Sequence, residues 1–153
     1  MTGNVYEAPL NEDTLSLLIS LSADWEKENS CHGYRKNTEA DIAGNRIFLA
    51  QADGQVIGYL FGHLAEAEKT SSIMQAGKRY FEIEELYVRP EKRSRGVGKS
   101  LFEYAEALLR GEGEADFILL STATKNWRAI LHFYLDELDM SFWSARLFKP
   151  LRP

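Results

Sequence analysis

The sequence lacks the residues that build a disulfide framework, and it has no long uncharged apolar segment. Cys31 is the single cysteine, which excludes a disulfide within the chain and favours a reducing compartment. No apolar stretch approaches the roughly 20 residues of a membrane-spanning helix, and residues 1–9 lack the pattern of a secretory leader. We therefore expect a cytoplasmic protein that does not interact with membranes.

An excess of positive charge is missing as well. The formal net charge is −5, which argues against a general role in binding nucleic acid. His32, His63 and His132 are not spaced like metal ligands, so we expect no metal site. The apolar and charged fractions, 44% and 27%, are ordinary, and no repeat or long linker divides the chain. The length of 153 residues predicts one domain over residues 1–153 with a sizeable hydrophobic core.

Apolar periodicity, cap residues and turn residues together predict the order of the secondary-structure elements. The Asp53-Gly54 pair between two apolar runs is typical of a two-residue hairpin turn. The expected elements are helices over 10–28 and 38–43, strands over 46–52 and 55–63, a loop with room for a helical fragment over 65–78, a strand over 80–88, a helix over 97–110, a strand over 117–122, a helix over 126–136 and a last strand over 144–148.

The strand over 80–88 contains a break in its alternation. Phe81 and Ile83 are apolar at one parity, whereas Leu86 and Val88 are apolar at the other. One extra residue at Glu84-Glu85, a β-bulge, would return all four side chains to a single buried face. The alternative is a strand that is covered on both faces.

A basic turn that contains two glycines separates this strand from the next helix. Gly96 and Gly98 remove side chains where the helix begins, so that another group can approach the backbone closely. The free N–H groups and the dipole of a helix start favour an anion, and a pyrophosphate fits this description. The alternative is a plain turn with solvated basic residues. The basic residues around the turn are Lys92, Arg93, Arg95 and Lys99.

Two stretches carry spaced motifs. The first, V-x-P-x-x-R-x-x-G-x-G, is formed by Val88, Pro90, Arg93, Gly96 and Gly98, and it resembles the acetyl-coenzyme A loop of the GNAT superfamily of N-acetyltransferases. The second is formed by Asn126, Ala129, Phe133 and Tyr134, and it resembles the signature N-x-x-A-x-x-F-Y of that superfamily, with the spacing shifted by one residue relative to many members.

The second stretch departs from the family pattern in one further way. The usual Gly-Phe after the tyrosine is replaced by the sequence from Leu138 to Phe142. Dinucleotide-binding turns and Walker loops do not match the first stretch, because their glycine spacing differs.

The resemblance implies an α/β fold: a mixed, mostly antiparallel twisted sheet that splays at its centre and is flanked by helices. It implies acetyl-CoA as co-substrate, with the thioester admitted at the bulge, and no metal. The residues that it assigns to acetyl-CoA are Leu86, Tyr87, Val88, Arg93, Ser94, Arg95, Gly96, Val97, Gly98, Lys99, Ser100, Asn126, Ala129 and Phe133.

Acetyl transfer to an amine needs a base for the amine and an acid for the departing thiolate. Glu84 and Glu85 lie beside the expected bulge, and Glu85 is preferred as the base because it holds the usual glutamate position in E-L-x-V. Tyr134 can donate a phenolic proton to the thiolate. The alternatives are solvated carboxylates and a tyrosine of the core.

The acceptor is not encoded in a motif. The superfamily forms part of its acceptor site from the early helical region, which makes Trp25 and Tyr34, with His32 and Arg35, the candidates. The acidic net charge favours a cationic small-molecule amine. A protein N-terminus or lysine, a non-catalytic acyl-CoA sensor on the same fold and, outside the family, a nucleotide-phosphate binder remain open, as does a homodimer.

Overall fold

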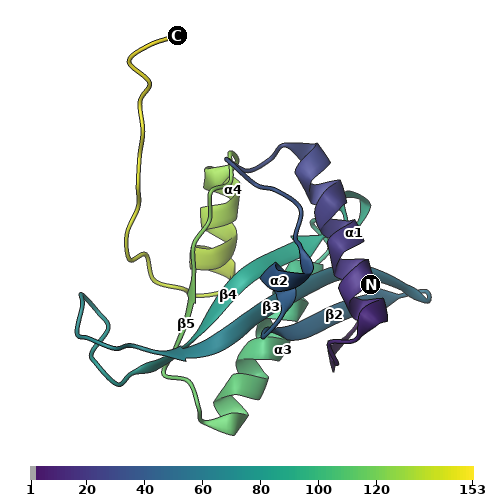
Figure 1. Cartoon of the computed structure of the whole chain (residues 1–153), viewed down its shortest axis with the longest axis horizontal. Coiled ribbons are helices and arrows are strands. Elements are labelled where there is room, and N and C mark those ends of the chain that lie inside the picture. Colours follow the sequence, from purple (N-terminus) through teal and green to yellow (C-terminus); the bar gives the residue numbers. More distant parts are fainter. Residues whose placement is uncertain (1–2) are drawn as a thin grey trace.

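The computed structural model describes residues 3–153. Met1 and Thr2, which belong to the stretch 1–9 that lacks the pattern of a secretory leader, lie outside the described residues. One sheet has the order β1-β2-β3-β4-β5 (Figure 1). Neighbouring strands are antiparallel except β4 and β5, which are parallel. The mixed, mostly antiparallel sheet is therefore confirmed. The strands are β1 (Asn4–Ala8), β2 (Arg46–Ala52), β3 (Gln55–Glu66), β4 (Arg79–Val88) and β5 (Phe117–Leu120).

Helices cover both faces of this sheet. One buried cluster joins it to α3, and a second, on the opposite face, joins it to α1 and α2. No described helix is both long and apolar enough to cross a bilayer. The helices are α1 (Glu12–Glu28), α2 (Glu39–Ile42), the 3-10 turn η1 (Pro90–Lys92), α3 (Val97–Glu112), α4 (Trp127–Leu131) and the π-helix η2 (His132–Glu137).

The helix ends follow from their cap residues. The Asn11 side chain accepts a hydrogen bond from the N–H of Thr14 and starts α1. Thr38 and Asp41 form a capping box at the start of α2. Gly113, with a φ of 67°, ends α3 in the left-handed conformation that glycine adopts without strain. These boundaries agree with the sequence pattern to within about two residues.

The β2–β3 hairpin is confirmed, and it is held closely against β4. Asp53 and Gly54 have φ values of 52° and 75°, the two positive angles of a type I′ turn. A Cβ on Gly58 would lie only 2.8 Å from the carbonyl oxygen of Tyr87, and one on Gly62 would overlap the carbonyl oxygen of Glu82. Both glycines are therefore required by the close approach of the β4 backbone.

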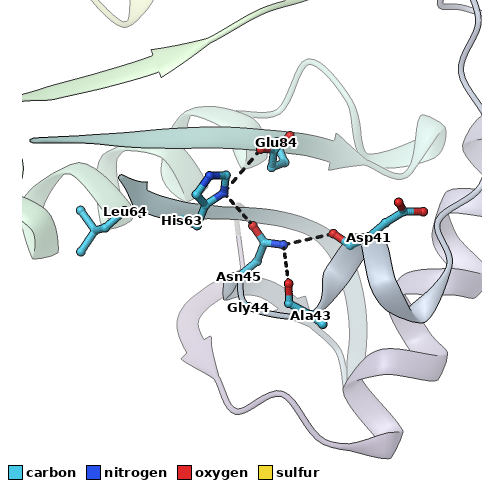
Figure 2. Close-up of a pocket in the computed structure, with 7 residues that line it drawn as sticks. All are labelled: Asp41, Ala43, Gly44, Asn45, His63, Leu64 and Glu84. Atoms are coloured by element: carbon cyan, nitrogen blue, oxygen red, sulfur yellow. Dashed lines mark hydrogen bonds and ion pairs between the residues drawn. The ribbon is translucent and has the colours of Figure 1, made fainter. Parts of the chain in front are cut away.

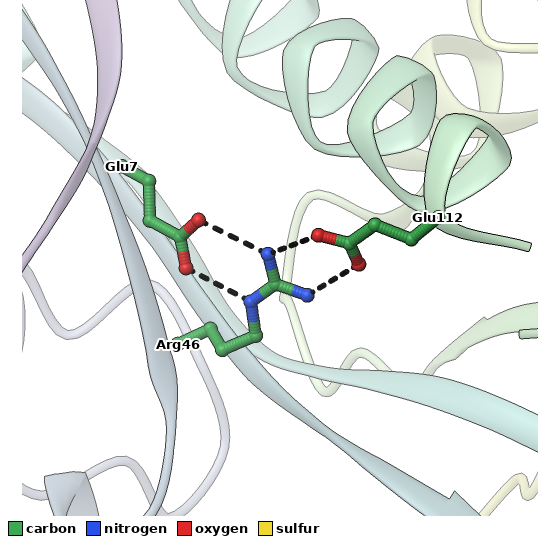
Figure 3. A network of polar contacts seen from close by, with 3 residues as sticks. All are labelled: Glu7, Arg46 and Glu112. Carbon is green, nitrogen blue, oxygen red and sulfur yellow. Dashed lines mark hydrogen bonds and ion pairs between the residues drawn. The ribbon is translucent and has the colours of Figure 1, made fainter. Parts of the chain in front are cut away.

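A network of charged side chains ties the edge of the sheet to α3 (Figure 3). The Arg46 guanidinium on β2 lies 2.8 Å from the carboxylate of Glu7 on β1 and 2.8 Å from that of Glu112 at the end of α3. These charge-assisted bonds raise the pKa of Arg46 and lower the pKa of Glu112. The three residues thus join β1, β2 and α3 at the surface.

The bulge in β4 is confirmed. Phe61 pairs with Glu85 and Gly62 pairs with Ile83, so that Glu84 is the additional residue. As a result Leu86 and Val88 pack, partly buried, against the same cluster that contains the buried Phe81 and Ile83. The β5 strand pairs with β4 only from Tyr80 to Ile83, which leaves β4 without a neighbour on that side from the bulge onward. The sheet therefore opens at the bulge.

The structure differs from the sequence prediction at both ends of the chain and in the loop between β3 and β4. The strand β1 was not predicted, because its short, partly polar sequence gains a partner only when β2 is in place. The predicted strand over 144–148 is wrong, since residues 141–150 are exposed and form no regular structure. The loop over 67–78 contains an isolated bridge between Ser71 and Met74 in place of the helical fragment.

The helix over residues 127–137 also differs in detail from the prediction. Asn126 precedes it, but the Asn126 side chain makes no capping hydrogen bond. Ala129, expected on the inner face, is exposed. The second half of the helix widens into a π-turn, in which the N–H of Leu138 donates to the carbonyl of Phe133 at 3.1 Å.

Candidate active site

The two glutamates of the bulge serve different networks on the face of the sheet that α1 and α2 cover. Glu85 bonds to Tyr59 and Glu84 to His63, and both partners lie on β3. Because the bulge adds one residue, two consecutive side chains of β4 reach the same face. The pattern that predicted the bulge thus also places both carboxylates.

The carboxylate of Glu85 is held through one of its two oxygens. Its Oε1 atom accepts hydrogen bonds from the Tyr59 hydroxyl at 2.7 Å, the Asn37 amide at 2.9 Å and the Tyr34 hydroxyl at 3.1 Å. Its Oε2 atom has no hydrogen-bond partner among residues 3–153 and remains available. Burial raises the pKa of Glu85, while the three hydrogen bonds stabilise the charged form and limit that rise.

The aromatic residues of this region form a wall beside Glu85. The Trp25 ring lies 4.4 Å from the Tyr34 ring and 5.2 Å from the Tyr87 ring, measured between centroids. Ser22 on α1 accepts a hydrogen bond from the N–H of Asn37 at 2.9 Å and fixes the segment that carries it. The wall borders a pocket of about 640 Å³ lined by Glu26, Gly33, Tyr34, Arg35, Lys36, Asn37, Thr38, Asp41 and Glu85.

Of the residues predicted for the acceptor, the structure brings three together. Tyr34 and Arg35 line the Glu85 pocket, and the Trp25 ring packs against the Tyr34 ring without lining the pocket itself. His32 lies apart, edge-on to Phe148 of the C-terminal segment at 5.4 Å. The structure therefore groups Trp25, Tyr34 and Arg35 beside Glu85, and their role toward an acceptor stays a prediction.

Glu84 belongs to a second, more solvated pocket of about 490 Å³ (Figure 2). Its Oε1 atom lies 3.4 Å from Nδ1 of His63, and its side chain is 45% exposed. The same ring nitrogen lies 3.3 Å from Oδ1 of Asn45, whose amide donates to the carbonyl of Asp41 at 3.1 Å. Asp41 lines both pockets, so that they are neighbours on one face of the sheet.

The start of α3 has the features expected of an anion site. Gly96 has a φ of 85°, which an L-residue adopts only with strain, and the helix follows directly. The first hydrogen bond of the helix runs from the N–H of Ser100 to the carbonyl of Gly96, so that the N–H groups of residues 97–99 have no acceptor within it. Arg95 is exposed beside them, and Lys99 is half-buried.

Arg93 does not stand free at this turn. Its guanidinium lies 2.8 Å from the carboxylate of Glu28 at the end of α1 and donates to the carbonyl of Val88 at 2.9 Å. The charge also lies over the Tyr87 ring, 5.5 Å from its centroid. In this structure Arg93 therefore ties α1 to the turn and holds the turn in place.

The α4–η2 helix packs against the start of α3. The ring of Phe133 lies 3.3 Å from the position that a Cβ on Gly98 would occupy, so that any side chain there would press on the ring. Tyr134 packs against the cluster on the α3 face of the sheet. Burial raises its pKa to about 12, and its hydroxyl donates to no side chain or carbonyl within residues 3–153. Its proton is therefore retained at neutral pH and is not engaged elsewhere.

Two residues of the site were missed in the sequence. Tyr59 alternates with Phe61 along β3 and looks like a core residue, while Asn37 looks like a loop residue before a cap. The bulge could have pointed to Tyr59. It sets Glu85 opposite Phe61, and Tyr59 lies two residues from Phe61 on the same face of β3. The part of the chain that the structure describes contains no cluster of three or more His, Cys, Asp or Glu side chains arranged for a metal ion.

A family model and a curated relative both match parts of this chain. Residues 15–138 match the family model described as the acetyltransferase (GNAT) family. A segment of 68 residues is 35% identical to the uncharacterized N-acetyltransferase in the pepI 3′ region of Lactobacillus delbrueckii subsp. lactis. That segment covers 44% of the chain and 37% of this relative, which is less than half of either protein.

Solved structures share the fold over nearly the whole chain. An aminoglycoside acetyltransferase, HMB0005, from an uncultured soil metagenomic sample superposes with a TM-score of 0.67 at 18% identity, over 97% of the chain and 98% of that protein. The aminoglycoside N-acetyltransferase AAC(6′)-Iy, solved in complex with CoA, superposes with a TM-score of 0.65 at 18% identity, over 98% of the chain and 100% of that protein. At these identities the likeness establishes the fold.

Proposed function

Because the chain belongs to the acetyltransferase (GNAT) family, we propose that it moves an acetyl group from acetyl-CoA to a primary amine by direct attack in a ternary complex. The observation that carries the proposal is the carboxylate of Glu85 beside the opened sheet. One of its oxygens is held by three donors, and the other is free to take a proton. A half-buried carboxylate with a raised pKa is suited to general base catalysis.

We assign the donor to the turn at the start of α3. The free N–H groups of residues 97–99 and the helix dipole would hold the pyrophosphate of acetyl-CoA, with Arg95 and Lys99 adding positive charge. From the bulge onward the Leu86–Val88 backbone of β4 has no strand on the side of β5, and it offers hydrogen-bonding groups to the amides of the donor's arm.

The reaction needs one base and one acid. The Oε2 atom of Glu85, directly or through a water molecule, takes the proton of the amine as its nitrogen attacks the thioester carbonyl. The C–S bond then breaks, the acetyl group stays on nitrogen, and the thiolate of coenzyme A takes a proton from the Tyr134 hydroxyl. With a pKa of about 12, Tyr134 is a weaker acid than a solvated phenol, so it donates only as negative charge develops on the sulfur.

The acceptor that we propose is a cationic small-molecule amine. The Glu85 pocket carries the carboxylates of Glu26, Asp41 and Glu85, although Arg35 and Lys36 also line it. The chain as a whole is acidic, which raises the encounter rate with cations. Aminoglycoside acetyltransferases of the same fold are consistent with this class. A protein N-terminus or lysine is the second candidate, because both pockets are open at the surface.

A turnover assay tests this proposal. Release of free coenzyme A from acetyl-CoA is measured with a panel of aminoglycosides, polyamines, basic peptides and acidic amines. We expect cationic amines to be the best acceptors and their kcat/KM to fall as salt is added, because screening weakens the attraction. A best acceptor that is acidic, or a kcat/KM that rises with salt, would contradict the cationic class. Acetyl-CoA binding without turnover of any amine would favour a sensor.

Replacing Gly98 with valine should weaken donor binding. The new side chain would press on Phe133 and fill the space through which the pyrophosphate approaches the helix start. We expect the dissociation constant for acetyl-CoA to rise about tenfold or more, which corresponds to about 1.4 kcal/mol. Calorimetric titration measures it. Gly111→Val is the matched control, since it makes the same change in α3 where the added Cβ has no atom from outside its own stretch of helix within 4 Å. Equal affinities in the two variants would refute the assignment.

Replacing Tyr59 with phenylalanine should shift the acidic limb of the pH profile. Glu85 must be ionised to act as base, and activity falls as pH drops through its pKa. The Tyr59 hydroxyl stabilises the ionised form, so that its removal raises the pKa of Glu85 further. We expect the acidic limb of the kcat/KM profile to move to higher pH by about one unit, because a hydrogen bond to a charged group is worth roughly 1.5 kcal/mol.

The control for this shift is Tyr6→Phe, which removes a partly buried hydroxyl bonded to Gln51 on β2, away from Glu85. Its profile should match that of the unmodified enzyme. A limb that stays in place in Tyr59→Phe, or that moves to lower pH, would show that Glu85 is not the titrating base.

A further inference from the structure

One carboxylate at the end of α1 contacts both halves of the proposed site. Glu28 is the last residue of this helix, and its side chain is only 19% exposed. Its Oε2 atom accepts hydrogen bonds from the Tyr87 hydroxyl and from the Arg93 guanidinium, both at 3.0 Å, and its Oε1 atom lies 2.8 Å from the same guanidinium. A carboxylate that has lost most of its water depends on such partners. Glu28 is therefore fixed by β4 on one side and by the turn before α3 on the other.

The Arg93 side of this arrangement leads to the turn that we assign to the donor. The Nε atom of Arg93 donates to the carbonyl of Val88 at 2.9 Å, while the far end of the guanidinium is held by Glu28. Val88 is the last residue of β4 and belongs to the stretch that we assign to the donor's arm. Because a guanidinium is rigid and planar, fixing one end fixes the direction of the bond made by the other. Glu28 therefore sets the position of Arg93 and, through it, the backbone at Val88.

The Tyr87 side leads to the aromatic wall and to the proposed base. Tyr87 is buried, and its ring lies 5.2 Å from the Trp25 ring and 5.6 Å from the Tyr59 ring, measured between centroids. The Tyr59 hydroxyl in turn donates to Glu85 at 2.7 Å. Burial and the bond to Glu28 raise the pKa of Tyr87, so that its hydroxyl keeps the proton that it donates. Closely packed rings cannot shift independently, and a displacement of Tyr87 therefore reaches both the wall and the base.

We propose that Glu28 is a positioning residue that couples the donor turn to the acceptor wall, so that binding of acetyl-CoA at the turn changes the surroundings of Trp25. The inference rests on the proposed function, because it takes the start of α3 as the donor site. Glu28 holds Arg93 and the Tyr87 hydroxyl with one carboxylate, and the guanidinium also lies over the Tyr87 ring. A shift of one partner therefore moves the other. Coupling of this kind is reciprocal, so that an occupied acceptor pocket tightens the donor as well.

Trp25 reports the coupling without any knowledge of the acceptor. The chain has three tryptophans, and the other two, Trp127 and Trp143, are exposed. The replacements Trp127→Phe and Trp143→Phe together leave Trp25 as the only indole, and its emission responds to the position of its neighbours. In this background we expect acetyl-CoA to change the emission of Trp25, with a midpoint equal to the dissociation constant that calorimetry gives.

Glu28→Gln in the same background should remove most of the change in Trp25 emission, measured at saturating acetyl-CoA. The amide keeps an oxygen that can accept from Tyr87, but it removes the charge that holds Arg93. We also expect the dissociation constant of acetyl-CoA to rise about tenfold. Glu106→Gln is the matched control, since it removes a carboxylate that is paired with Arg110 at 3.0 Å on α3, and it should leave the response intact.

Arg93→Lys is a second variant, which carries the test if Glu28→Gln does not fold. Lysine keeps the positive charge of the turn but cannot bond to Glu28 and to the Val88 carbonyl at once, so the Trp25 response should again be lost. A response that persists in both variants would overturn the coupling.

Two further results would also overturn the inference, and they differ in what they say of the proposed function. If the unmodified chain bound acetyl-CoA in the calorimeter while the emission of Trp25 stayed constant, the donor site would stand and the coupling alone would be refuted. If the chain bound no acetyl-CoA, the assignment of the donor would fail and the coupling with it.

Discussion

Replacement of Glu85 with glutamine should lower kcat by about 10² to 10⁴-fold, the range that general base catalysis contributes. Glutamine keeps the size of the side chain and can still accept hydrogen bonds through its amide oxygen from Tyr34, Asn37 and Tyr59. It cannot take a proton from the amine. The pocket and the donor site should therefore persist, and calorimetry should show an almost unchanged dissociation constant for acetyl-CoA.

The neighbouring residue supplies the control for this experiment. Glu84→Gln makes the same chemical change one residue earlier, in the same bulge, but on a side chain that bonds to His63 in the more solvated pocket. We expect it to change kcat by less than about tenfold, since it removes no proton acceptor from the proposed reaction. If Glu84→Gln were the more damaging change, the base would have to be assigned to Glu84.

Replacement of Tyr134 with phenylalanine should also lower kcat by about 10² to 10⁴-fold while donor affinity changes little. Phenylalanine keeps the ring that packs against the α3 face of the sheet and removes only the hydroxyl. Because that hydroxyl makes no hydrogen bond to a described residue, its loss should leave the folded state almost as stable. Single-turnover kinetics with a saturating amine would measure the chemical step directly.

Tyr104→Phe is the matched control for the tyrosine experiment. Tyr104 lies on the exposed side of α3, with its ring edge-on to Phe48. Its hydroxyl is remote from the opening in the sheet, so kcat should be unaffected. A Tyr134→Phe enzyme with near-normal kcat would make Tyr134 a packing residue, and the thiolate would then be protonated by water or by the acceptor amine.

The parts of the structure that could be predicted are those that local sequence specifies. The Asp53-Gly54 turn, the cap at Asn11 and the change of apolar parity at Glu84-Glu85 each depend on a few neighbouring residues, and all three are confirmed. The bulge was the most informative, because one residue of slippage accounts for both the shared buried face of β4 and the opening beside β5.

The parts that could not be predicted depend on partners distant in sequence. Asn37 and Tyr59 meet at Glu85 only because α2 and β3 pack on the same face of the sheet, and no spacing rule connects the three positions. Arg93 matches the family motif, but its bond to Glu28 depends on where α1 ends. The segment expected as a strand over 144–148 pairs with no strand among residues 3–153, and whether it pairs depends on a distant edge of the sheet.

The π-turn over His132–Glu137 has a consequence for how the helix is aligned with the family pattern. A π-turn takes up one residue more than an α-turn, and such turns occur frequently at functional sites. The spacing between Ala129 and Phe133 exceeds the family pattern by one residue, which is the size of insertion that the wide turn accommodates. The direction in which the Tyr134 hydroxyl points is therefore set by the number of residues in the helix as much as by their identity.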